Sequence, residues 1–280
     1  MRGSVYVRVA RTRLLRSTVR LEPMPKRLVP LFLAALTAVL LPQPATAQEA
    51  IPGVYGPVVR RGITFYLRYN MTTGVAEDQI PFGNPGDRPL LCDWDGSGFR
   101  QLGVHRGNTF YLEVGAEVLT VPYGNVGDQP LCGDWDGDGV ETIGVRRGNQ
   151  WFLSDDDIIN TGGAAAADHT FFYGDVGDQG FVGDFDGNGT ATPGVRRGIT
   201  FYLSNNLNGG NASLPSFPYG DPGDIPVFAD WDAGTTLSET AGVFRNGQWF
   251  YKISNTGGIG DGQFVYGSPG DVPLIYREDA

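Results

Sequence analysis

The sequence contains few of the residues on which most catalytic and transition-metal sites depend. Its 280 residues include only two histidines, two cysteines and three methionines. Zinc sites usually take imidazole or thiolate ligands, and nucleophilic catalysis needs a base beside the nucleophile. No base, nucleophile and orienting group can be assembled around His105, which we place on a strand surface, or around His169, which we place in a loop. The sequence therefore predicts neither a zinc centre nor an enzyme.

Positive charge is also scarce once the first 47 residues are set aside. Those residues hold eight of the 21 lysines and arginines but only one of the 31 acidic residues. The remainder has 13 basic and 30 acidic residues, a net charge near −17, and a single lysine, Lys252. A surface this acidic repels nucleic acid and anionic lipid and attracts cations. We expect no nucleic-acid partner.

The first 47 residues are typical of an export signal rather than of a folded domain. A basic start at 24–27 precedes an apolar run at 28–41 that is too short for a comfortable membrane span, and an A-x-A site ends at Ala47. This order predicts a basic leader and secretory signal peptide over 1–47, a secreted protein, and no membrane insertion after cleavage. Translation from Met24 and an uncleaved membrane anchor are the alternatives.

A sustained helical period is missing, and a repeat of short β-type runs takes its place. A Gly-Asp pair recurs with its aspartate at positions 87, 128, 178, 224 and 271, and an aromatic–glycine pair precedes each copy. Each unit holds about four short runs rich in aromatic and β-branched residues, separated by turns. Four strands in a unit of 41 to 50 residues are typical of a propeller blade.

We predict an all-β fold over 48–280: a five-bladed β-propeller of four-stranded antiparallel blades. Four units lie near 86–126, 127–176, 177–222 and 223–269. Residues 52–85 match the later strands of a unit and residues 270–280 match a first strand, so the two ends complete a shared fifth blade. Sharing this blade removes the open edges of a linear stack. A linear β-solenoid, which needs no complementary ends, is the alternative.

The stretch GDWDGDGVETIGVRRG at 133–148 places three aspartates on alternate positions. Carboxylates this close repel one another unless a cation neutralises them. Oxygen ligands alone in an open loop favour Ca²⁺ over Mg²⁺ or zinc. We predict a calcium site formed by Asp134, Asp136 and Asp138, with the carbonyl of Val140 and the hydroxyl of Thr142 as further ligands. An Asx-rich turn without metal is the alternative.

Two weaker copies of this loop are predicted to bind calcium with lower affinity, since ligand charge helps to set affinity. Their candidate ligands are Asp184, Asp186, Asn188, Thr190 and Thr192 in one copy, and Asp93, Asp95 and Ser97 in the other. In a further copy, Asp230 and Asp232 are followed by Ala233, and we expect no metal there.

The order of these motifs resembles the FG-GAP and VCBS-type repeats of integrin-α-like propellers. Residues such as YGNVGDQPLCGDWDGDGVETIGVRRG carry the likeness, which covers about 52–277. The resemblance implies that the acidic loop joins the first two strands of a blade and binds Ca²⁺. The sequence departs from it at the ninth loop position, where Thr142 and Thr192 replace the usual carboxylate, and in having only five blades.

Each Gly-Asp aspartate is matched by an arginine at the end of a strand. These arginines are Arg61, Arg106, Arg147, Arg197 and Arg245. Because the arginines and aspartates occur in equal numbers and at the same place in every repeat, they indicate a structural arginine–carboxylate bridge rather than a catalytic site. Cys92 and Cys132 fall on first strands of adjacent blades, one register step apart, so the sequence leaves their disulfide open.

These features favour a secreted, calcium-binding, non-enzymatic module for binding or adhesion to an extracellular protein or glycan. Polar loops at 155–168 and 205–216 are where specificity would reside. The alternative is a lectin with one carbohydrate site per blade, because one of each pair of strand aromatics could be exposed and stack on sugars. A glycan-cleaving enzyme would need paired carboxylates at the axis, outside the repeat, and no such acids stand out.

Overall fold

The computed structural model describes residues 55–163, 166–232 and 238–277. The predicted signal peptide and the alternative start at Met24 lie outside these ranges. Within them, α1 (Ile158–Thr161) is the single helix, and no helix is long and apolar enough to cross a membrane.

Twenty strands in the described ranges form five sheets of four strands, and all pairings within them are antiparallel. Blade 1 comprises β20 (Val272–Arg277), β1 (Tyr55–Arg61), β2 (Thr64–Leu67) and β3 (Asp78–Pro81). Blade 2 comprises β4 (Arg88–Cys92), β5 (Gln101–Arg106), β6 (Thr109–Val114) and β7 (Glu117–Pro122). Blade 3 comprises β8 (Gln129–Gly133), β9 (Thr142–Arg147), β10 (Gln150–Leu153) and β11 (His169–Phe172). Blade 4 comprises β12 (Gln179–Gly183), β13 (Thr192–Arg197), β14 (Thr200–Leu203) and β15 (Phe217–Pro218). Blade 5 comprises β16 (Ile225–Ala229), β17 (Thr240–Arg245), β18 (Gln248–Tyr251) and β19 (Gly262–Val265).

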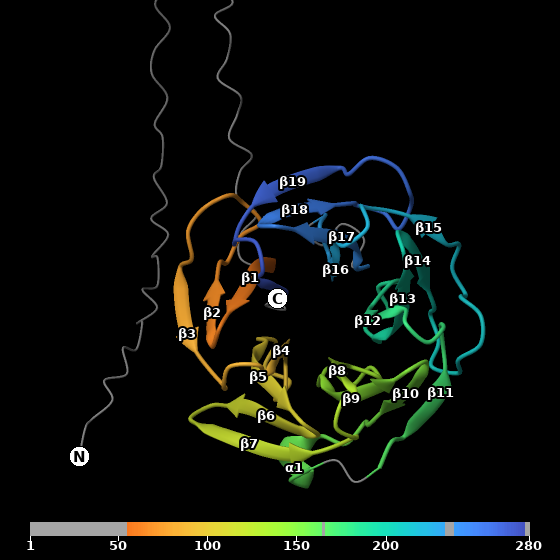
Figure 1. Ribbon diagram of the computed structural model, residues 1–280. Coiled ribbons are helices and arrows are strands. Elements are labelled where there is room, and N and C mark those ends of the chain that lie inside the picture. The colour runs from red at the N-terminus through yellow and green to blue at the C-terminus, as the bar shows by residue number, and fades with distance from the viewer. Residues whose placement is uncertain (1–54, 164–165, 233–237, 278–280) are drawn as a thin grey trace, which may run out of the picture. The chain divides into compact units, whose positions relative to one another are not determined.

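The five sheets form a ring, with the first strand of each blade nearest the axis (Figure 1). β20 of blade 1 pairs with β1 through six residue pairs, from Tyr55 opposite Arg277 to Arg60 opposite Val272. The two ends of the repeat region therefore build one blade, as predicted. This pairing confirms the five-bladed propeller and excludes a linear solenoid.

The hydrophobic core is divided into five clusters, one at each interface between neighbouring blades. The cluster between blades 5 and 1 joins Val59 and Ile275 to Trp249 and Phe264. This interface connects the closing blade to the last complete one, so the ring is closed by apolar packing as well as by strand pairing.

The repeated aromatic runs supply much of this core because alternate side chains in a strand face opposite sides. In β10, Trp151 and Leu153 are fully buried while Phe152 is half-buried. Trp135, between two loop aspartates, is 2% exposed and packs over Gly144, where an added Cβ would lie 2.6 Å from Leu153. Glycine is required there because the two strands and the loop tryptophan approach so closely. Trp135 therefore anchors its loop in the blade.

The predicted arginine–aspartate bridges are present in all five blades, and each joins the first strand of a blade to the second. In blade 3, Nε of Arg147 donates to Oδ1 of Asp128 and Nη2 donates to Oδ2, both at 2.8 Å. The same carboxylate accepts the backbone N–H of Asn125, which shapes the turn before the strand. The other bridges are Arg61–Asp271, Arg106–Asp87, Arg197–Asp178 and Arg245–Asp224.

A second set of arginines, one residue earlier, links three of the five blades to the next. Arg146 donates to the carbonyls of Asp178 and Asp175 at 2.8 and 3.0 Å, and Arg60 and Arg196 make equivalent bonds. His105 occupies this position in blade 2 and is 4% exposed, so its predicted surface location is wrong. The position faces the neighbouring blade instead of solvent.

Blade 2 replaces the missing inter-blade arginine from a different strand. His105 packs against Phe110 with ring centroids 4.6 Å apart. Arg88 donates to the Asp128 carbonyl at 2.9 Å, which is the contact that Arg146 makes one blade further on. The aspartate carbonyl of the Gly-Asp turn therefore accepts a guanidinium N–H in both blades, from Arg88 in one and from Arg146 in the other.

Cys92 and Cys132 form a disulfide between the innermost strands of blades 2 and 3. Their Cα atoms are 6.5 Å apart, within the usual range for a disulfide. The offset of one residue does not prevent the bond because β4 and β8 belong to different sheets, so no ladder fixes their register.

We expect replacement of Asp87 by asparagine to lower the free energy of unfolding by about 1–3 kcal/mol, because charged hydrogen bonds to Arg106 are weakened. Bonds from Arg106 lower the pKa of Asp87, and bonds from Arg197 likewise lower the pKa of Asp178, below the ordinary value of 3.8. Their stabilisation is full above that value and is lost as pH falls through the lower folded-state pKa.

Urea unfolding between pH 7 and pH 2 tests this prediction, with Glu117→Gln at an exposed position as control. Asp87→Asn should show a shallower loss of stability in acid than the wild type. Equal acid profiles would contradict the assigned role of the bridge.

We expect the Cys92→Ser, Cys132→Ser double variant to lose about 2–4 kcal/mol of stability, because the bond closes a long loop in the unfolded chain. Reduction of the wild-type protein should produce the same loss. Two titratable thiols in the denatured, unreduced protein would contradict the disulfide.

Candidate functional site

The acidic loops connect the first and second strands of their blades. The Asp134 loop lies between β8 and β9, the Asp184 loop between β12 and β13, and the Asp93 loop between β4 and β5. The long connections between third and fourth strands leave on the same side, since successive strands are antiparallel. We call this side the acidic-loop face.

Three carboxylates converge in the Asp134 loop, where oxygens of Asp134, Asp136 and Asp138 lie within 4.8 Å of one another. Asp134 is half-buried, and the other two aspartates are exposed. Burial raises the pKa of Asp134, backbone N–H donors oppose this, and the charges of Asp138 and Asp136 raise it further. Among the described residues this is the one group of three acidic side chains placed to share a cation.

The first aspartate also organises the loop through backbone hydrogen bonds. Asp134 accepts N–H groups of Gly137 at 2.6 Å and Gly139 at 2.9 Å, and Asp138 accepts that of Val140 at 2.9 Å. These bonds leave further lone pairs on the carboxylates, since each ionised group can accept about four bonds. The carboxylates therefore retain acceptor capacity beyond these backbone bonds.

The hydroxyls of the predicted ligands Thr142 and Thr192 each donate to a backbone carbonyl. Thr142 is 4% exposed, and its hydroxyl donates to the Gly133 carbonyl at 3.4 Å. Thr192 makes the equivalent bond to Gly183 at 3.2 Å. Both hydroxyls therefore point at a strand carbonyl, while the Val140 backbone stays within the loop.

The Asp184 loop repeats this geometry with less charge. Asp184 accepts the N–H groups of Gly187 and Gly189, each at 2.8 Å, and Asn188 accepts that of Thr190 at 2.8 Å. Burial, followed by the charge of Asp184, raises the pKa of Asp186.

In the Asp93 loop, a side-chain amide already occupies part of the hydrogen-bonding capacity of the carboxylates. The side-chain amide of Gln101 donates to Asp95 at 2.6 Å and to Ser97 at 3.1 Å. Asp93 accepts backbone N–H groups of Ser97 and Gly98. An amide at the open side of the loop favours the low predicted calcium affinity. The Asp230 loop runs into residues 233–237, which are outside the described ranges.

The long loops on the acidic-loop face are anchored on the preceding blade. Ile158 of α1, in the loop that follows β10, is 3% exposed and packs in the cluster between blades 2 and 3. In the loop after β14, the Gly210 N–H donates to the Phe172 carbonyl of β11 at 3.0 Å. The loops predicted to carry specificity are thus held by the ring.

A charged cluster that the sequence did not reveal lies at the axis. Arg100 donates to both carboxylate oxygens of Glu141, at 3.0 and 2.6 Å, and Glu239 is 5% exposed. Each glutamate also accepts a backbone N–H from the preceding blade: Glu141 from Asp93 at 2.7 Å and Glu239 from Asp184 at 3.2 Å.

Acidic residues outside the repeat therefore do lie at the axis, so the expectation from the sequence that none stand out is wrong. Residues 55, 100, 141, 191 and 239 occupy one equivalent position, six residues before the bridging arginine of each blade. This position is Tyr, Arg, Glu, Ala and Glu in turn, so it breaks the repeat. The change of residue type at one position of an otherwise regular repeat is the sequence feature that could have revealed this cluster.

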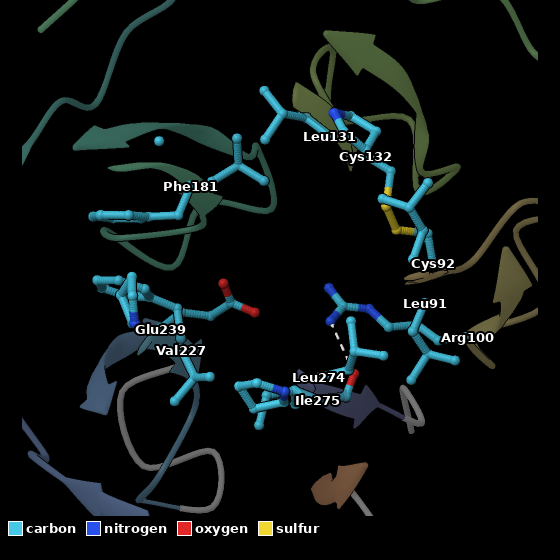
Figure 2. A pocket seen from close by; sticks show the side chains of 17 residues that line it. Leu91, Cys92, Arg100, Leu131, Cys132, Phe181, Val227, Glu239, Leu274 and Ile275 are labelled. Carbon is cyan, nitrogen blue, oxygen red and sulfur yellow. Dashed lines mark hydrogen bonds between the residues drawn. A yellow bond between two sulfur atoms is a disulfide. The ribbon is translucent and has the colours of Figure 1, made fainter. Parts of the chain in front are cut away.

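Of these five residues, Arg100 and Glu239 border a cavity of about 250 Å³ that is lined by the first strands of all five blades. Figure 2 shows the Glu239 carboxylate and the Arg100 guanidinium projecting from opposite sides of it. Burial raises the pKa of Glu239, and the charges of Arg100 and Arg277 oppose the shift. The cavity walls are mainly apolar, with the disulfide on one side.

The aromatics of the third strands do not form open stacking surfaces. Phe110, Trp151, Phe201 and Trp249 are fully buried. Their half-buried neighbours lie beneath the bridging arginines, as where the Arg106 guanidinium carbon is 4.7 Å from the Tyr111 ring centre. The residues that suggested one sugar site per blade are thus engaged in the blades themselves.

Comparison with known proteins identifies no family for this chain. No protein-family model and no curated protein matches the chain, so the resemblance to FG-GAP and VCBS repeats stays a prediction. A chain from a structure of the Photorhabdus luminescens Tc holotoxin pore aligns with 13% identity and a TM-score of 0.40. The alignment covers 78% of this chain and 11% of that chain. The assignment as a five-bladed propeller rests on the strand pairing.

We expect opposite effects from neutralising the two axial glutamates. Glu141→Gln weakens the bridge to Arg100 and should lower the free energy of unfolding by about 1–3 kcal/mol. Because burial raises the pKa of Glu239, the contribution of this residue to stability is full below its ordinary pKa of 4.5 and is lost as pH rises through the folded-state pKa. Glu239→Gln should therefore stabilise the protein at neutral pH and not at pH 4.

Thermal or urea unfolding of the two variants at pH 4 and pH 7.5 checks these signs. A destabilised Glu239→Gln protein at pH 7.5 would show that the glutamate is held mainly by its ionic partners.

Proposed function

We propose that this protein is a secreted, non-enzymatic binding or adhesion module whose acidic-loop face is braced by Ca²⁺. The observation that carries the proposal is the convergence of Asp134, Asp136 and Asp138 in a strongly acidic chain. A hard cation would relieve their repulsion and hold the loop in one conformation. The Asp184 and Asp93 loops would bind the same ion more weakly.

The binding surface would be the acidic-loop face, with the anchored long loops after β10 and β14 contacting an extracellular protein or glycan. A rigid ring supports such recognition because little ordering entropy is lost on binding. The predicted export signal and the disulfide between Cys92 and Cys132 both fit an oxidising compartment.

We expect Ca²⁺ to stabilise the chelator-treated protein by about 2.7 kcal/mol when its free concentration is a hundred times the Kd. The Asp136→Asn, Asp138→Asn double variant should lose most of this gain, because both exposed ligand charges are removed. Glu117→Gln should retain it. Thermal unfolding with and without Ca²⁺ and calorimetric titration give the readout; no shift and no heat in the wild type would refute the calcium proposal.

A glycan array with and without Ca²⁺ distinguishes the binding modes. We expect no family of equivalent weak sugar sites, because the aromatics of the third strands are buried or lie beneath arginines. Several such sites would establish the lectin alternative, and products released from polysaccharides would overturn the non-enzymatic assignment.

A further inference from the structure

The axial cavity combines an apolar wall with a polar end. Leucine, valine, phenylalanine, proline and isoleucine side chains from the five first strands form the wall, while Arg100 and Glu239 enter from the starts of second strands or the turns before them. At about 250 Å³ the cavity exceeds the ~150 Å³ that suffices for benzene, and it approaches the lower limit of ordinary ligand pockets, near 300 Å³.

The polar end offers both a donor and an acceptor. The Glu239 carboxylate is 95% buried as a residue, and its Oε2 accepts the Asp184 N–H at 3.2 Å; its other oxygen has no hydrogen bond to the described residues. Nη1 of Arg100 makes one long bond, 3.4 Å, to the Ile275 carbonyl. A carboxyl oxygen and a guanidinium N–H therefore both remain for a ligand.

Charges of both signs surround this end. Arg100 is paired with Glu141 at 2.6 Å, and Arg100 and Arg277 both act electrostatically on Glu239. An anionic head group would gain from the arginines but meet two carboxylates, and a cationic one would meet the reverse. A neutral head group avoids the cost of burying an uncompensated charge.

We propose that the axial cavity binds a small amphiphile with an aliphatic or aromatic body and a neutral head group that both donates and accepts hydrogen bonds, such as a primary amide. The head group donates to Glu239 and accepts from Arg100, and the body lies against Leu131, Val182 and Leu274. The site uses none of the acidic-loop carboxylates, although Glu239 accepts the backbone N–H of Asp184 from one of these loops.

Three probes with the same body separate the head-group chemistries: hexanamide, hexanoate and hexylamine. Ligand-observed NMR and calorimetric titration of the full protein, with chelator present, should show hexanamide binding about tenfold more tightly than either charged probe. Equal affinity for all three, or preference for a charged probe, overturns the head-group assignment. No binding of any probe overturns the site and leaves a water-filled channel.

Matched variants locate the binding. Val182→Phe fills the cavity from β12 and should abolish hexanamide binding, whereas Val126→Phe, at a position 81% exposed, should leave it unchanged. Glu239→Gln keeps an acceptor oxygen and should retain binding, while Glu239→Leu should weaken it about tenfold. Binding that survives both Val182→Phe and Glu239→Leu would place the ligand elsewhere and refute the proposal, even if these variants fold less stably.

Discussion

The pairing of β1 with β20 is the constraint on which the rest of the structure depends. Each four-stranded sheet has apolar side chains on both faces, so it needs a neighbour on each side. Blade 1 provides this for blades 5 and 2 only because residues from both ends of the repeat region assemble it. Closure thus converts a linear repeat into five buried interfaces and leaves no blade without a partner.

Two arginine positions stabilise this ring in different ways. The bridging arginines tie the first two strands within each blade and cover a half-buried aromatic, whereas the preceding residue faces the next blade. That second position tolerates exchange: His105 and Phe244 replace arginine there and pack on Phe110 and Trp249. Arg88 restores the lost donor in one case. The within-blade bridge is constant because a buried aspartate without its guanidinium would be costly.

The same closure creates a site that no single unit contains. Five equivalent positions meet around one axis, so differences that are minor along the chain become a local set of Arg, Glu and Tyr side chains. Glu141 is bound by Arg100, while Glu239 is buried with a raised pKa. The acidic loops differ from this axial cluster, because each loop is built from residues that are consecutive in the sequence. Their charge is met by backbone N–H groups and, at Asp95, by Gln101.

The repeat alone determined the five blades, the shared closing blade, the arginine–aspartate bridges and the convergence of Asp134, Asp136 and Asp138, because strand alternation, turns and loop ligands are set by neighbouring residues. Tertiary structure decided what depends on residues from different blades. The burial of His105, the disulfide at the axis and the meeting of Arg100, Glu141 and Glu239 all follow from how the sheets face one another. Ring closure brings residues more than one hundred positions apart to the same cavity. Their spacing in the sequence does not reveal these distances across the ring.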